Sequence, residues 1–175
     1  MSMINTNYCI GALDILLDRS CLSERYFPLI PLKDSLISQL QLMGCKTKND
    51  ASSLSDEALM LAGLGDPDTA RLLRRFLTIY DPNPQKLKEI TKLCTTPEEQ
   101  TAFRELYHLP GVKYVRANLY YRAGYSSIRD FAETTEKEVL SRTAAAITDN
   151  DLSCIVPLPK EVRTHIAVSK AFMWE

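Results

Sequence analysis

The stretch Leu109-Pro110-Gly111-Val112-Lys113-Tyr114-Val115-Arg116-Ala117 decides the fold of the second half of this chain. A Pro-Gly pair between two apolar residues predicts a tight turn, because Gly111 readily adopts the positive φ that such a turn needs. The small Ala117 allows two helices to approach each other closely. The stretch therefore predicts a hairpin between two helices.

The composition is that of an ordinary globular protein, with 45% apolar and 25% charged side chains in 175 residues. This length is enough to bury a core, in one domain or in two small ones. No apolar run approaches the roughly 20 residues of a membrane-spanning helix, and the first eight residues lack the basic and apolar regions of a signal peptide. We therefore expect a cytoplasmic protein that does not enter a membrane.

The cysteine and histidine pattern gives no sign of a metal site. The five cysteines are odd in number, none forms a Cys-x-x-Cys pair, and only two histidines accompany them. We expect free and mostly buried thiols, and we expect neither a metal nor a cofactor. The cysteines are Cys9, Cys21, Cys45, Cys94 and Cys154.

The charges are unevenly distributed although the formal net charge is only −1. Residues 67–95 carry six basic and three acidic side chains. Residues 109–129 carry four basic side chains and no acid, and residues 130–151 carry six acids against two basic residues. Such blocks can form a basic face on a neutral protein, or they can be solvated helix surfaces without a ligand.

Apolar residues recur at three- and four-residue spacing through most of the chain, and no segment shows sustained two-residue alternation. Ser55 and Thr96 are expected N-caps, Pro97 fits a first helical position, and Gly44 is expected just after a helix end. The chain is therefore predicted to be all-α. Helices are expected over residues 7–18, 33–43, 55–62, 68–80, 85–93, 96–108, 112–123, 127–133, 135–147 and 159–173.

A shift of 80 residues aligns the two halves of the chain and indicates an internal repeat. The shared features are an apolar helix face, a terminating glycine and an N-cap 11 residues later. The identical pairs are Leu29 and Leu109, Lys33 and Lys113, Gly44 and Gly124, and Asp50 and Asp130. Helical amphipathicity alone can also produce such matches. The predicted organisation is an N-terminal helix in residues 1–28, helical units over 29–95 and 96–157, and a C-terminal helix in 158–175.

The hairpin resembles the helix-hairpin-helix family, whose pattern is roughly apolar-x-Gly-apolar-Gly-x-x-x-Ala. Gly111 and Ala117 match this pattern, whereas Lys113 replaces the second glycine. The following Ala123-Gly124-Tyr125 and Ile128-Arg129-Asp130-Phe131-Ala132 are similar to tandem helix-hairpin-helix (SAM-like) domains of DNA repair and topology proteins, and to related domains of unknown function. The resemblance covers residues 105–147 well. It implies two small helical bundles flanked by terminal helices.

The resemblance implies a non-enzymatic protein that binds the nucleic-acid phosphate backbone without reading sequence. The Gly111 turn with Val112, Lys113 and Arg116 would hold one phosphate. A second hairpin at Gly63-Leu64-Gly65 keeps both family glycines, has Arg71 downstream, and would hold another. Tyrosines between the basic residues could stack on bases, although their helical spacing also fits a core. These are Tyr107, Tyr114, Tyr120, Tyr121 and Tyr125.

Two alternatives use the same residues differently. The string that begins at His108 is similar to the hairpin of DNA glycosylases, but the expected catalytic aspartate context is missing around Asp130, so we expect no such activity and no catalytic residue. The other alternative is a protein-interaction or self-association module, in which the hairpins are compact connectors. The near-zero net charge suits this second role, and the opposite charges of residues 109–129 and 130–151 could pair between subunits.

Overall fold

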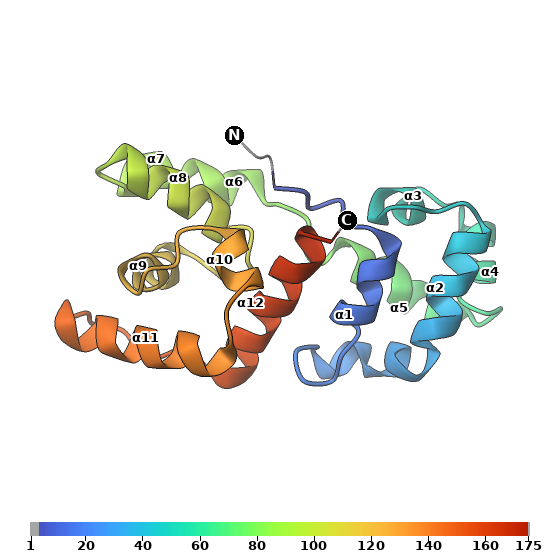
Figure 1. The fold of residues 1–175 in the computed structure, drawn as a ribbon. Helices are drawn as coiled ribbons and strands as arrows, with labels where there is room; N and C mark the ends of the chain where they lie inside the picture. The colour runs from blue at the N-terminus through green and yellow to red at the C-terminus, as the bar shows by residue number, and fades with distance from the viewer. Residues whose placement is uncertain (1–3, 175) are drawn as a thin grey trace. The chain divides into compact units, whose positions relative to one another are not determined.

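The computed structural model describes residues 4–174 and consists of helices joined by short connections (Figure 1). Within this range no strand forms, and the only β pairing is an isolated antiparallel bridge between Cys9 and Thr47. The prediction of an all-α fold is confirmed.

The chain divides into two compact units. The first unit comprises residues 5–80 together with 170–174, and the second comprises residues 81–169 together with residue 4. The predicted ranges 1–28, 29–95, 96–157 and 158–175 group the chain differently and remain predictions, and residues 1–3 and 175 lie outside the described part.

The first unit begins with short helices and ends with a long amphipathic one. Its core contains Leu13, Leu36, Leu40, Leu73 and Phe76, all fully buried. The indole Nε1 of Trp174 lies 3.5 Å from the position that a Cβ on Gly11 would take, so the ring packs beside Gly11 at ordinary van der Waals distance. The elements are the 3-10 helices η1 (Ile10–Ala12) and η2 (Glu24–Leu32) and the α-helices α1 (Leu13–Leu16), α2 (Lys33–Leu42), α3 (Lys48–Ser52), α4 (Asp56–Ala62) and α5 (Pro67–Thr78).

The second unit contains the predicted hairpin. Its core contains Phe103, Leu109, Tyr120 and Phe131, and the rings of Tyr120 and Phe131 meet edge to face at 4.7 Å between centroids. The elements are α6 (Pro84–Lys88), α7 (Ile90–Leu93), α8 (Pro97–Leu106), α9 (Tyr114–Arg122), α10 (Ile128–Ala132), α11 (Glu136–Asp149) and α12 (Pro159–Phe172), the last turn of which is grouped with the first unit.

Most predicted helix ends are confirmed. The side chains of Ser55, Thr96 and Thr135 each accept a hydrogen bond from the third residue of the helix they precede, as N-caps do. Gly44 and Gly124 have φ of 85° and 93°, a conformation that glycine adopts without strain just after a helix.

Four predictions differ from the structure. The segment 7–18 forms η1 and α1 with only seven helical residues, and the segment 85–93 divides into α6 and α7. Pro28 and Pro31, expected to interrupt the chain, lie inside the 3-10 helix η2. Val112 belongs to the hairpin turn instead of the following helix, because α9 begins at Tyr114 with Lys113 as its N-cap.

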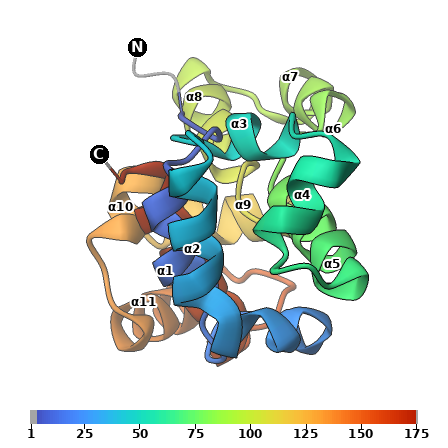
Figure 2. The same ribbon diagram turned by 90° about the vertical axis from the view of Figure 1, so that its right-hand side faces the viewer.

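The 80-residue repeat recurs in the local geometry of the two units. The glycine turn after α2 carries a hydrogen bond from Cys45 N to Leu40 O of 3.0 Å, and the turn after α9 carries the corresponding bond from Tyr125 N to Tyr120 O of 2.9 Å. Thr47 and Ser127 then form capping boxes with Asp50 and Asp130, again 80 residues apart. The order α2–α3–α4 in the first unit therefore corresponds to α9–α10–α11 in the second, and Figure 2 shows the first of these sets, with α4 beside α2.

The last helix of each unit makes a similar ion pair, although the two arginines lie outside the 80-residue register. Arg74 of α5 pairs with Asp56, the first residue of α4, at 3.0 Å. Arg163 of α12 pairs with Glu136, the first residue of α11, at 3.1 Å. In each unit, an arginine of the last helix thus forms an ion pair with the acidic first residue of the preceding helix.

Candidate binding groove of the second unit

The predicted hairpin is present between α8 and α9. Gly111 has φ of 73°, and nothing lies within 4 Å of the position that a Cβ would take, so the positive φ is what requires glycine at this position. The N–H of Val112 donates to Leu109 O at 3.2 Å and closes the turn, which leaves Val112 buried.

The start of α9 lacks a capping side chain. Lys113 occupies the N-cap position, makes no capping hydrogen bond, and no acidic residue follows in the first turn. Helices α4, α5, α8 and α11 all begin at a side chain that accepts a backbone N–H. The N-terminus of α9 therefore has a positive dipole end that no side chain of the hairpin neutralises.

Arg116 does not point its charge freely into solvent. Its Nε lies 2.8 Å from Glu161 Oε1, and its Nη1 donates to Ile155 O at 3.0 Å. Glu161 also accepts from the backbone N–H of Leu158 at 3.4 Å. These contacts fix the segment 153–158 to α9, and they occupy the guanidinium that we predicted to bind phosphate.

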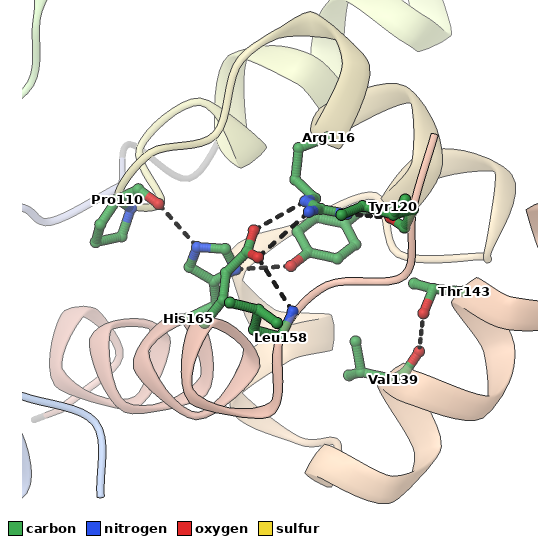
Figure 3. Close-up of polar contacts among 9 residues, drawn as sticks. Pro110, Arg116, Tyr120, Val139, Thr143, Leu158 and His165 are labelled. Carbon is green, nitrogen blue, oxygen red and sulfur yellow. Dashed lines mark hydrogen bonds and ion pairs between the residues drawn. The ribbon is translucent and has the colours of Figure 1, made fainter. Parts of the chain in front are cut away.

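Hydrogen bonds of the buried His165, which we call the His165 relay, also hold the hairpin in place (Figure 3). His165 of α12 lies between Pro110 O and Tyr120 OH, at 2.8 Å from each. The Pro110 carbonyl can only accept, so Nε2 of His165 carries the proton and Nδ1 accepts from the Tyr120 hydroxyl. Burial lowers the pKa of His165 to about 4; the Pro110 carbonyl and Glu161 oppose this shift, and Arg116 and Lys86 add to it.

An open groove of about 700 Å³ lies beside the hairpin. One wall is the hairpin and the first turn of α9, and the other is the segment 153–155. Val115 and Ile155 line this space and are 61% and 75% exposed, so the groove carries two large aliphatic side chains that are open to solvent. The lining residues are Glu89, Gly111, Lys113, Tyr114, Val115, Arg116, Ser153, Cys154, Ile155 and Glu161.

The positive charge of the groove centres on Lys113. The side chain of Lys113 is exposed, and no described residue forms an ion pair with it. Lys86 lies close by, since burial and the charge of Lys113 both lower the pKa of Lys86. Lys86 itself donates to Tyr107 O at 3.4 Å, which leaves Lys113 as the accessible ammonium.

The second predicted hairpin, Gly63-Leu64-Gly65, lies in the first unit, and the helix that follows it is capped by an acidic side chain. A Cβ on Gly63 would lie 2.8 Å from Ala70 N, so Gly63 allows the turn to pack against the α5 backbone. Asp66 caps α5 with its carboxylate, and Arg71 pairs with Asp68 at 2.6 Å. Gly65 has a positive φ of 79° with open space around it. An aspartate thus already occupies the N–H groups that we predicted to bind phosphate.

The predicted aromatic set is largely part of the core. Tyr107, Tyr120 and Tyr125 are buried, and only Tyr114 reaches the groove. The groove residues that the sequence did not reveal are Ile155, Cys154 and Glu161. Ile155 and Glu161 contact Arg116 of α9 across 39 and 45 residues of chain, and no local pattern encodes such contacts.

The described residues hold no group of three metal-ligating side chains, and their cysteines are free thiols. None of the helices between residues 4 and 174 combines the length and apolar character of a membrane-spanning segment. No model of a known protein family matches this chain, and no curated protein or solved structure matches it either. The resemblance to helix-hairpin-helix domains therefore remains a prediction from the residues quoted above.

Proposed function

We propose that this chain is a non-enzymatic protein-interaction module whose second unit binds a segment of a partner protein in the groove between α9 and residues 153–158. One observation carries the proposal: Val115 and Ile155 remain exposed on opposing walls that Arg116 holds together. A groove whose walls are fixed in advance loses little conformational entropy when a ligand binds. Exposed aliphatic side chains in such a groove gain free energy when a partner covers them.

Nucleic-acid backbone binding is the second candidate, and the uncapped start of α9 beside Gly111 and Lys113 favours it. Two further observations weigh against it. The guanidinium groups of Arg116 and Arg71 are paired with carboxylates, and Asp66 occupies the start of α5. A single accessible lysine supplies little of the phosphate neutralisation on which sequence-independent binding depends.

A peptide-display selection on the full chain tests the proposal. We expect enriched peptides to bind the unaltered chain and to bind at least fivefold more weakly to Val115→Ser and Ile155→Ser, because each change removes apolar contact area. Leu61→Ser is the matched control, since Leu61 is 63% exposed on α4 and lies outside the groove.

The same proteins are then titrated with labelled duplex and single-stranded DNA at low and moderate salt. An unchanged peptide affinity in both Val115→Ser and Ile155→Ser would contradict the proposal. Salt-sensitive DNA binding that Lys113→Glu weakens, together with no peptide enrichment, would favour the second candidate.

A further inference from the structure

The groove is lined by both positive and apolar groups. Lys113 and the uncapped first turn of α9 supply the positive charge, because the helix dipole adds to the lysine charge there. Tyr114, Val115 and Ile155 supply the apolar surface. A ligand that matches this arrangement carries an anionic group next to an aliphatic side chain.

A carboxylate fits Lys113 and the start of α9 better than a phosphate group does. Bidentate phosphate recognition uses the guanidinium of arginine, and Arg116 is already bonded to Glu161 and to the Ile155 carbonyl. One ammonium and the N–H groups of one helical turn match a single carboxylate, as an acidic N-cap does elsewhere in proteins. Asp66 at the start of α5 shows this pairing within the same chain.

The acidic side chain of Glu89 limits the charge of the ligand. Glu89 lines the same groove as Lys113. A second acidic residue in the ligand would be repelled by this carboxylate, and its desolvation would lower the affinity further. The groove therefore favours one acidic residue over an acidic run.

The internal repeat provides an independent comparison. Lys33 begins α2 at the position that corresponds to Lys113, and its Nζ pairs with Asp14 Oδ1 at 2.8 Å. Asp14 belongs to the short helix α1, Leu13–Leu16, in which both terminal leucines are buried. In the first unit, the chain itself thus provides a carboxylate flanked by aliphatic residues for this lysine, whereas no described residue pairs with Lys113.

We infer that the groove of the second unit binds a short peptide segment with one acidic side chain placed on Lys113 and the α9 N-terminus, and an adjacent aliphatic side chain between Val115 and Ile155. This inference rests on the proposed function and specifies the chemistry of its partner. Because the anionic contact combines a charge-assisted hydrogen bond with the dipole of α9, its loss should weaken binding about tenfold.

Synthetic peptides and matched lysine variants test the inference. A labelled peptide that contains Leu-Asp-Ile-Leu-Leu, the sequence of residues 13–17, is titrated into the full chain and followed by fluorescence anisotropy. The Asp→Asn peptide should bind about tenfold more weakly, and Lys113→Met should weaken the aspartate peptide to the same extent without affecting the asparagine peptide. Lys137→Met is the control, because Lys137 is an exposed lysine of α11 outside the groove.

The outcomes separate the inference from the proposed function. The inference would be overturned if Val115→Ser and Ile155→Ser weaken peptide binding, but neither the Asp→Asn peptide nor Lys113→Met changes the affinity. The proposed function would then still stand. No binding of this peptide, combined with no peptide enriched by the display selection, would overturn both. Equal loss with Lys137→Met would show general charge attraction and would also contradict the inference.

Discussion

Replacing His165 with leucine should destabilise the second unit, because the buried Tyr120 hydroxyl and the part-buried Pro110 carbonyl would lose their hydrogen-bond partner. His165 is 1% exposed, and its ring bridges Tyr120 OH and Pro110 O at 2.8 Å each. An unsatisfied buried donor or acceptor costs about 1–3 kcal/mol. Since leucine restores some apolar contact, we expect the free energy of unfolding to fall by about 2–4 kcal/mol at pH 7.

The same side chain should make stability depend on pH. Burial lowers the pKa of His165 to about 4 in the folded chain, whereas an exposed histidine titrates near 6.5. Between these values the unfolded chain binds a proton that the folded chain does not, so stability is full above pH 6.5 and decreases as the pH falls toward 4. At about 1.4 kcal/mol per pKa unit, the loss between pH 7 and pH 5 is about 2 kcal/mol.

Urea unfolding followed by circular dichroism at both pH values measures these effects, and hydrogen exchange of the α9 and α12 amides assigns them to the second unit. His165→Leu should be less stable at pH 7 and should lose the histidine part of the pH dependence. His108→Gln, which alters the other histidine, should retain it. A His165→Leu chain as stable as the unaltered one, or with the same decrease toward pH 5, would refute the buried neutral relay.

Four further substitutions test other parts of the structure. Gly63→Ala should lower the free energy of unfolding by about 1–3 kcal/mol in urea titrations, because its Cβ would meet the Ala70 backbone at 2.8 Å. Arg116→Ala should increase protease cleavage and hydrogen exchange in residues 150–158, and an unchanged exchange rate there would contradict its anchoring role. Thr47→Ala and Ser127→Ala should each cost about 1 kcal/mol, and a clear inequality would argue against equivalent capping boxes in the two units.

Local features of the fold were predictable because their physical causes are local. Gly44 and Gly124 end helices through a positive φ that few other residues tolerate. Thr96 caps the start of α8 with its side chain, and the ring of Pro97 fixes the φ of the first helical residue. The 3-10 helix η2 was not predictable in this way, since its prolines normally indicate a break and tertiary packing holds them in a helical segment.

The candidate site was only partly predictable. The Gly111 turn and Lys113 follow from the hairpin pattern, and both line the groove. The partners of Arg116 and the relay of His165 depend on residues 39–55 positions away, so a lone arginine or histidine in the sequence reveals neither. Both arginines that were expected to meet phosphate, Arg116 and Arg71, therefore form intramolecular ion pairs instead.

The contact between Trp174 and Gly11 gives the first unit an intrinsic optical reporter. Trp174 is the only tryptophan of the chain, and its indole Nε1 lies 3.5 Å from where a Cβ on residue 11 would stand. Its emission wavelength and quenching by acrylamide thus report one defined contact without an added dye. Excitation at the red edge of the tryptophan absorption band does not excite the eight tyrosines. The docking of the last turn of α12 can therefore be followed by tryptophan fluorescence in the unlabelled protein.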